Sequence, residues 1–135
     1  TDASGRTLSG QTTEAFYNSV CHVNPLSIGL NCALGPDMLR QYVDALSNVA
    51  ECFVSVHPNA GLPNEFGEYD LGADEMAEHS GEWADSRLIN IVGGCCGTTP
   101  EHIVRMRQAV SGKTPRTPLP ASALMRLSGL EAFNL

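Results

Sequence analysis

The chain has 135 residues, of which 42% are hydrophobic and 17% are charged, and its formal net charge at pH 7 is −7. A chain of this length and composition can bury one modest core, which argues against global disorder. The acidic balance argues against a nucleic-acid-binding protein, which needs a basic face, and no apolar run approaches the roughly 20 residues of a membrane span.

Short apolar runs alternate with segments of helical periodicity along most of the chain. After Gly35, for example, apolar residues recur every three or four positions, and Pro36 suits a first helical turn. The predicted elements are, in chain order, a helix over 11–22, a strand over 26–30, a helix over 36–51, a strand over 52–56, a helix over 73–85, a strand over 88–92 and a helix over about 98–110. Because all three strands are continuous and apolar, we expect a parallel sheet covered on both faces, an α/β fold.

The last predicted helix and the residues after it carry local signals. Thr98 and Glu101 have the spacing of a capping box. Residues 112–122 contain three prolines and should form an extended connector, while 123–135 have a weak strand-like pattern. Several polar side chains are expected to face solvent, namely His22, His79 and His102 on helices and Glu65, Glu68 and Asp70 in the long loop over 57–72.

Five cysteines in a chain without a visible signal peptide favour reduced thiols or a metal site over disulfides, and a cytoplasmic location. Cys32 follows the first predicted strand, and Cys95 and Cys96 follow the third. Parallel α/β sheets bind ligands at the carboxyl ends of their strands, so these thiols should share one edge of the sheet. His57 and Asn59, which follow the second strand, are expected at the same edge.

Three thiols converging from two loops could hold zinc, with a fourth tetrahedral position left for water or substrate. The flanking glycines Gly93, Gly94 and Gly97 would let the backbone bring both neighbouring sulfurs to one ion. Vicinal cysteines also occur as inert buried thiols or as redox pairs, and spacing alone leaves these alternatives open. Cys21 and Cys52 are expected to be core thiols.

Three stretches, GLNCALGP (29–36), HPNAGLPNEFGEYD (57–70) and NIVGGCCGTTPEHI (90–103), resemble the homocysteine-binding domain of cobalamin-dependent methionine synthases. The wider homocysteine S-methyltransferase family shares the Asn-Cys and Gly-Gly-Cys-Cys-Gly pieces. The HPNAGLP loop and the closing RLSGLEAFNL (126–135) are similar to the methionine synthase branch in particular. In that branch, such a tail leads into a folate-binding domain.

The resemblance implies a (β/α)8 TIM barrel, of which residues 1–111 would be the last three strand–helix units with the preceding helix. Residues 112–135 would be the connector and tail toward a following domain. Zinc would be held by Cys32, Cys95 and Cys96, and the homocysteine sulfur would take the fourth position. The methyl group would come from methylcobalamin on a separate domain, giving methionine.

Two alternatives and two further expectations accompany this hypothesis. The methyl donor could instead be betaine or S-methylmethionine, or the chain could be a non-catalytic zinc or thiol-redox fragment. Without homocysteine, Asn59 is the expected fourth zinc ligand, because its loop lies between the two cysteine loops. A fragment without the other barrel strands should be marginally stable and self-associate through its open sheet edges.

Overall fold

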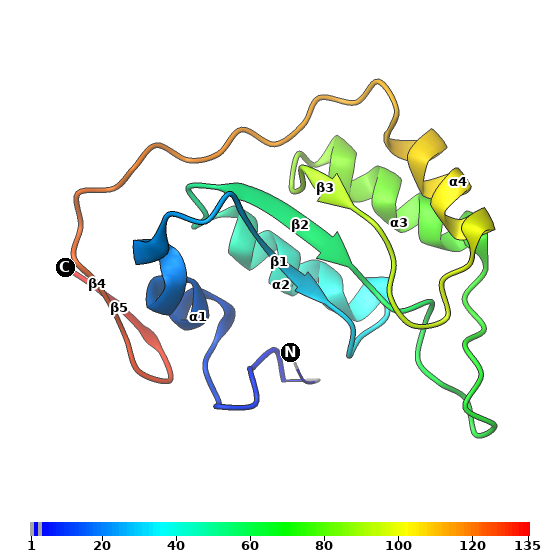
Figure 1. Cartoon of the computed structure of the whole chain (residues 1–135), viewed down its shortest axis with the longest axis horizontal. Helices are drawn as coiled ribbons and strands as arrows, with labels where there is room; N and C mark the ends of the chain where they lie inside the picture. Colours follow the sequence, from blue (N-terminus) through cyan, green and yellow to red (C-terminus); the bar gives the residue numbers. More distant parts are fainter. Residues whose placement is uncertain (1, 3) are drawn as a thin grey trace.

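Strands and helices alternate along most of the chain, and a two-stranded hairpin follows them (Figure 1). The structure is a computed structural model that describes residue 2 and residues 4–135. Its elements are α1 (Thr13–Val20), the 3-10 turn η1 (Cys21–Val23), β1 (Ser27–Asn31), α2 (Pro36–Ser47), β2 (Phe53–His57), α3 (Ala73–Asp85), β3 (Ile91–Val92), α4 (Pro100–Val110), β4 (Arg126–Ser128) and β5 (Ala132–Asn134). The order agrees with the predicted helix, the three strand–helix units and the strand-like tail.

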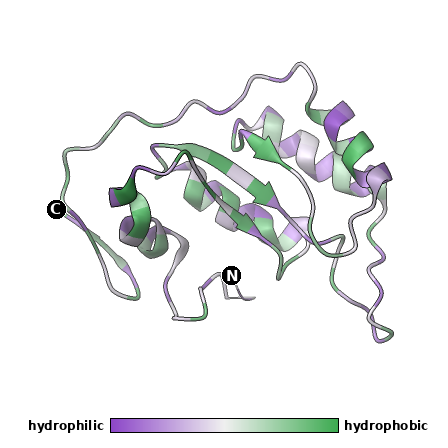
Figure 2. Ribbon diagram, in the orientation of Figure 1, coloured by the Kyte–Doolittle hydropathy of each residue, from purple (hydrophilic) through white to green (hydrophobic). Residues whose placement is uncertain are grey.

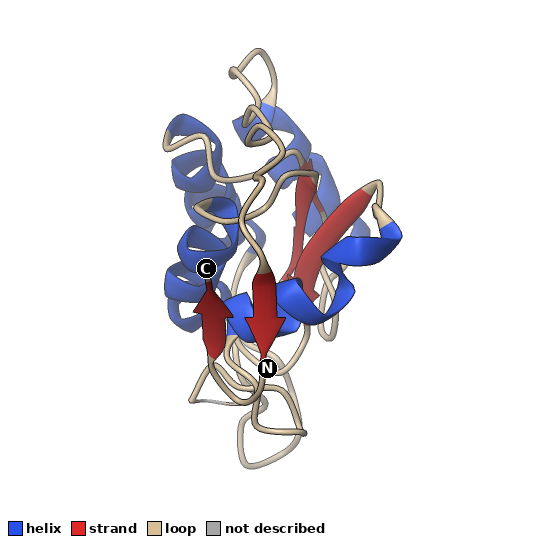
Figure 3. Ribbon diagram, turned by 90° about the vertical axis from the view of Figure 1, so that its left-hand side faces the viewer, coloured by secondary structure: helices blue, strands red, loops and turns tan. Residues whose placement is uncertain are grey.

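Strands β1, β2 and β3 form a parallel sheet in that order, which confirms the predicted arrangement. The register places Ser27 beside Phe53 and Ser55 beside Ile91. Helices α2 and α3 lie on one side of this sheet (Figures 2 and 3). The apolar side chains between the sheet and these helices form the core. Its principal members are Ile28, Leu30, Val54 and Val56 from the strands and Leu39, Val43, Leu46 and Trp83 from the helices.

The opposite face of the sheet is only partly covered, so the expectation of a sheet covered on both faces is wrong for the described residues. Phe53 and Ile91 on this face are 41% and 43% exposed. Strands β1 and β3 are the two edges of the sheet. The predicted self-association through these edges stays a prediction. Within the described residues, no helix has both the length and the apolar composition to cross a membrane.

Helix α2 is shorter than its apolar pattern predicts. It begins at Pro36 after the extended N-cap Gly35, as predicted, but it ends at Ser47 instead of continuing to 51. The backbone N–H groups of Val49 and Ala50 both donate to the Leu46 carbonyl, at 3.2 and 3.0 Å. This tight turn sends the chain directly into β2.

Two further boundaries also differ from prediction. Strand β3 covers only 91–92. Leu88 and Ile89, which were expected to belong to it, are buried in the segment that leads into the strand. Helix α4 begins one residue later than expected, with Thr99 as N-cap and His102 completing the capping box. His102 is therefore buried and not solvent-facing, and its Nε2 lies 2.8 Å from the Leu71 carbonyl oxygen.

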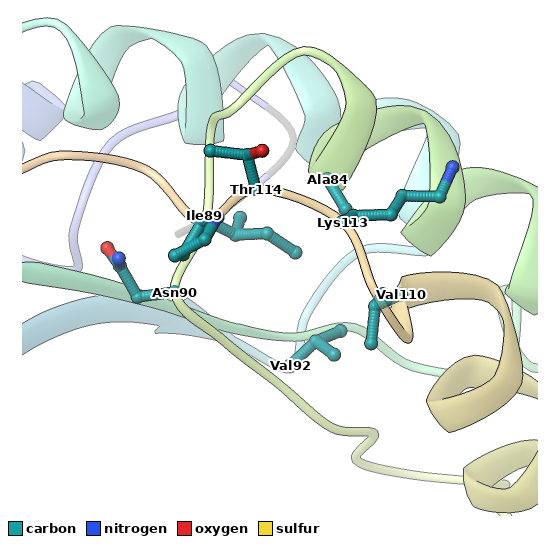
Figure 4. Close-up of a pocket in the computed structure, with 8 residues that line it drawn as sticks. Ala84, Ile89, Asn90, Val92, Val110, Lys113 and Thr114 are labelled. Carbon is teal, nitrogen blue, oxygen red and sulfur yellow. The ribbon is translucent and has the colours of Figure 1, made fainter.

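The proline-rich connector is extended, as predicted, and it is also anchored to the domain. The Arg116 backbone N–H donates to the Ile89 carbonyl at 3.2 Å, and the Asn90 side chain donates to the Arg116 carbonyl at 2.6 Å. Further along, the Leu119 N–H donates to the Ala50 carbonyl at 3.3 Å. Between the start of the connector, α3, β3 and α4 lies a pocket of about 190 Å³ (Figure 4).

Strands β4 and β5 form an antiparallel hairpin beside α1 (Figure 3). Its polar side chains point toward the helix: the Asn18 Nδ2 donates to Asn134 Oδ1 at 2.9 Å, and the hydroxyls of Ser19 and Ser128 are 2.7 Å apart. The alternate, apolar positions of the hairpin are exposed, namely Met125, Leu127, Phe133 and Leu135.

Candidate metal centre

The first cysteine loop follows β1 in a tight, unusual turn. Cys32 and Ala33 both have left-handed backbone conformations, with φ of 60° and 62°, which residues other than glycine rarely adopt. The turn is fixed by hydrogen bonds from Cys32 N–H to the His57 carbonyl at 2.9 Å and from Leu34 N–H to the Cys32 carbonyl at 2.7 Å. A non-glycine residue held in this region costs on the order of 1 kcal/mol or more, which is characteristic of functional sites.

The second cysteine loop, between β3 and α4, is bonded to the loop that follows β2. The Cys95 N–H donates to the Pro58 carbonyl at 2.8 Å, and the Cys96 N–H donates to the Asn59 Oδ1 at 3.3 Å. In return, the Ala60 N–H donates to the Cys96 carbonyl at 2.8 Å. These bonds bring the carboxyl end of β3 to that of β2, as the predicted sheet edge requires.

The three predicted cysteines bring their sulfurs together in one triangle. The Cys32 and Cys96 Sγ atoms are 3.5 Å apart, the Cys95 and Cys96 Sγ atoms are 3.9 Å apart, and all three lie within 4.8 Å of one another. Thiolates about 2.3 Å from a tetrahedral zinc would be about 3.8 Å apart. All three cysteines are free and half-buried. Both the spacing and the thiolate chemistry fit a zinc ion.

Hydrogen bonds distribute charge unevenly over the three sulfurs. The pKa of Cys32 is lowered, chiefly because the Ala33 backbone N–H donates to its sulfur, and secondarily because the Cys96 and Cys95 thiols do. The pKa of Cys96 is raised, chiefly because its thiol is bonded to Cys32, while a hydrogen bond from Tyr69 acts in the opposite direction. Without a metal, Cys32 is therefore expected to ionise before Cys96.

Comparison with known families assigns the chain that carries this cluster. The family model described as homocysteine S-methyltransferase matches residues 1–110, a segment that includes all three cysteines. The chain belongs to the homocysteine S-methyltransferase family.

The other polar residues predicted for this edge of the methyltransferase also lie beside the cluster. Asn59 is 3% exposed, its Oδ1 accepts a hydrogen bond from the Cys96 N–H, and its side chain helps to lower the pKa of Cys32. His57 ends β2 and lines an open hollow of about 360 Å³ together with Asn31 and Cys95. A small polar substrate could therefore reach the sulfurs from the uncovered face of the sheet.

The cysteines and acidic residues that were not assigned to the site lie apart from it. Cys21 and Cys52 pack against the main hydrophobic core, in agreement with their predicted role as core thiols. Burial raises the pKa of Cys52, which keeps this thiol protonated. The loop carboxylates Glu65, Glu68 and Asp70 are exposed, as predicted.

Tyr69 is a residue beside the cysteine cluster that the sequence pattern did not indicate. It lies near the end of the loop between β2 and α3, and its ring packs against Gly97. Its interaction with the Cys96 thiol raises the pKa of the Tyr69 hydroxyl. The spacing of residues in FGEYD (66–70) does not indicate that Tyr69 lies near a cysteine. This position is seen only in the structure, where the Tyr69 ring packs against Gly97.

Gly97 provides a sharp test of how closely these two loops pack. Its φ is +76°, and a Cβ at this position would lie 2.3 Å from the Tyr69 Cβ. We expect Gly97→Ala to lower the free energy of unfolding by about 1 kcal/mol for the backbone and about 1–3 kcal/mol more for the clash. Zinc affinity should fall with it, because Cys96 must move.

A matched control is Gly112→Ala, since Gly112 has φ +75° and a Cβ added there would have open space for 4 Å around it. This variant should show only the backbone cost in urea denaturation and should bind zinc as the parent does. Equal losses in the two variants would mean that Tyr69 does not restrict the Gly97 position.

Proposed function

We propose that this chain is the zinc-binding part of a methionine synthase-type homocysteine methyltransferase, with Cys32, Cys95 and Cys96 as the metal ligands. The observation that carries the proposal is the triangle of three sulfurs at the carboxyl edge of the sheet in a homocysteine S-methyltransferase chain. Residues 1–111 would form the last three strand–helix units of a (β/α)8 barrel. The uncovered sheet face would then be part of the barrel interior.

The substrate's thiol must be converted to a thiolate before it can accept a methyl group. A free thiol has a pKa near 8.5, so only a few per cent is ionised at neutral pH. Zinc, when bound, would act as a Lewis acid that lowers the pKa of this thiol, so that its proton is lost to water. The chain supplies the three cysteine ligands, held by the hydrogen bonds at Ala33 and Asn59. The sulfur then attacks the methyl carbon in line, and the electron pair of the broken bond leaves with the donor.

Methylcobalamin is the donor that we propose, presented by a separate cobalamin-binding domain, with a folate-binding domain following this chain. The HPNAGLP loop and the RLSGLEAFNL tail support the methionine synthase branch over enzymes that use betaine or S-methylmethionine. Asn59 is the proposed fourth zinc ligand before homocysteine binds. Its Oδ1 accepts one hydrogen bond from Cys96, and a second lone pair is available for the metal.

X-ray absorption at the zinc edge tests the proposal directly. The zinc-loaded chain should show three sulfur ligands and one lighter ligand, and added homocysteine should raise the number of sulfur ligands to four. In Asn59→Ala the resting spectrum should change while the four-sulfur spectrum stays the same. Zinc that gains no sulfur from homocysteine would contradict the proposal, and a metal-free Cys95–Cys96 disulfide would support the thiol-redox alternative.

Product formation with methylcobalamin, betaine and S-methylmethionine, each offered separately, identifies the donor. In a protein that also contains the remaining barrel strands, methionine should form with methylcobalamin and with neither of the other two donors, whereas this fragment by itself is expected to be inactive.

A further inference from the structure

Alternate residues of β1 and β2 face the uncovered side of the sheet, and they become polar toward its carboxyl edge. On this side Phe53 begins β2 and is 41% exposed, Ser55 follows, and His57 ends the strand. In the neighbouring strand, Asn31 is the register partner of His57. The two polar residues therefore lie side by side at the edge of the sheet where the cysteines are (Figure 1).

Glycines make room beside this pair. A Cβ on Gly93 would lie 2.5 Å from His57 Cδ2 and 3.0 Å from its Nε2, so the edge of the imidazole lies directly against this glycine. Gly29 lines the same hollow and contributes no side chain to it. The hollow of about 360 Å³ thus places His57 and Asn31 in one open space with Cys95.

Both polar side chains have hydrogen-bond donors available. Among the residues that the structure describes, neither the Asn31 amide nor the His57 imidazole has a hydrogen-bond partner. Asn31 is exposed and His57 is half-buried. A neutral imidazole offers one N–H donor, and a side-chain amide offers two. An acceptor that enters the hollow would therefore meet donors from two adjacent strands.

We propose that His57 and Asn31 bind the carboxylate of homocysteine while its thiol is on the metal. This inference rests on the proposed function, because it places the substrate thiol at the cysteine cluster. In homocysteine, the carbon that carries the carboxylate and the ammonium group is joined to the thiol by only two methylene groups. A thiol beside Cys95 therefore leaves the carboxylate in the adjoining hollow, where charge-assisted hydrogen bonds from the two donors would hold it.

A second attachment point gives the site orientation and selectivity. A thiol bound only through its sulfur can rotate about the metal–sulfur bond, and any small thiol could take its place. Holding the carboxylate as well would fix the direction from which the sulfur meets the methyl group. It would also favour thiols that carry a carboxylate, because a site built to hydrogen-bond a substrate group rejects analogues that lack it.

Two thiols separate the ends of the substrate. The first, 4-mercaptobutyrate, keeps the thiol and the carboxylate and lacks the ammonium group, and 3-aminopropane-1-thiol keeps the thiol and the ammonium group and lacks the carboxylate. Binding is measured with cobalt(II) in place of zinc, because an added thiolate ligand strengthens the sulfur-to-cobalt charge-transfer band. The parent chain should bind 4-mercaptobutyrate more tightly than the amine. The negative charge of three thiolates around the metal favours the opposite order, so this result requires donors for the carboxylate.

His57→Ala and Asn31→Asp remove the two sets of donors. Each should weaken the binding of homocysteine on the order of tenfold or more, the effect of one lost hydrogen bond to a charged group. In His57→Ala, 3-aminopropane-1-thiol should bind as it does to the parent chain, because it has no carboxylate to lose. The matched control is His22→Ala, since His22 is exposed on η1, which precedes β1 at the opposite end of the strands.

Gly93→Ala changes the position of the imidazole without removing it. Its Cβ would displace the His57 ring, so homocysteine should bind more weakly while cobalt affinity, measured by chelator competition, stays the same. Gly72→Ala is the control, because a Cβ there would have open space for 4 Å around it. Circular dichroism and the melting temperature check the fold of each variant. If His57→Ala does not fold, Gly93→Ala carries the test.

Equal losses for homocysteine and 3-aminopropane-1-thiol in His57→Ala would overturn the inference, because an effect that does not depend on the carboxylate is structural. Homocysteine binding equal to that of the parent chain in both His57→Ala and Asn31→Asp would also overturn it. In these cases the proposed function stands as long as homocysteine adds a sulfur ligand to the metal of the parent chain. If it adds none, both proposals are wrong.

Discussion

A Cys96→Ala chain is expected to lose its zinc and, with it, the ability to activate homocysteine. The Cys96 sulfur lies 3.5 Å from the Cys32 sulfur and 3.9 Å from the Cys95 sulfur. Its removal therefore leaves only two sulfur ligands for the metal. Because removal of a partner that merely orients a metal ligand already costs about 10–100-fold in affinity, loss of a ligand should cost at least about 100-fold. Metal analysis after dialysis, followed by chelator competition, measures the loss.

The control for this variant is Cys52→Ala, which removes a cysteine outside the cluster. Cys52 packs against the main core, so its replacement should lower the melting temperature slightly and leave one zinc per chain. Cys32→Ala and Cys95→Ala should behave like Cys96→Ala. Full zinc occupancy in Cys96→Ala would remove this residue from the ligand set.

Arg116→Ala should cause the largest loss of stability among single changes in the connector. Arg116 is 4% exposed, and its guanidinium donates to the carbonyl oxygens of Ser47, the last residue of α2, and of Ala50 and Cys52 after the helix. The Ser47 carbonyl carries part of the negative charge of the helix end, and without Arg116 it would lose its guanidinium donors in a buried position. We expect the free energy of unfolding to fall by about 3–5 kcal/mol, a large part of the whole stability of a small domain.

Urea denaturation measures this loss, and Thr117→Ala is the neighbouring control. Thr117 lies on the same connector and is exposed, so its replacement should change stability by less than about 0.5 kcal/mol. Arg116→Lys should recover only part of the loss, because one ammonium group cannot replace the planar set of donors. If Arg116→Ala were as stable as Thr117→Ala, the connector would not be a structural part of the domain.

Hydrophobic pattern and position along the chain were enough to predict the sheet and its helices. The apolar runs at β1 and β2 and the three-to-four-residue spacing of Leu39, Val43 and Leu46 are local properties of the sequence. The ends of elements depended on contacts that are distant in sequence. Helix α2 ends at Ser47, whose carbonyl accepts from Arg116, and no pattern near Ser47 indicates an arginine in the connector.

The three cysteines of the site could be predicted because topology alone brings the carboxyl ends of parallel strands together. Tyr69 could not, because its place depends on how the loop after β2 folds back over Gly97. The capping box was misplaced for a similar reason. Thr98 with Glu101 and Thr99 with His102 fit the start of α4 almost equally well, and the Leu71 carbonyl that holds the His102 ring belongs to another segment.

The contact between α1 and the hairpin has a consequence for the order in which the chain folds. Asn18 and Asn134, which share a hydrogen bond, are 116 positions apart, and Ser19 and Ser128 are 109 apart. Contacts this distant form late, because the entropy of closing so long a loop must be overcome before they contribute. During synthesis, α1 is made well before the hairpin, so the Asn18 side chain has neither of its partners, Leu127 and Asn134, until the hairpin has been made. A ribosome that stalls before β4 would leave this buried amide without these hydrogen bonds.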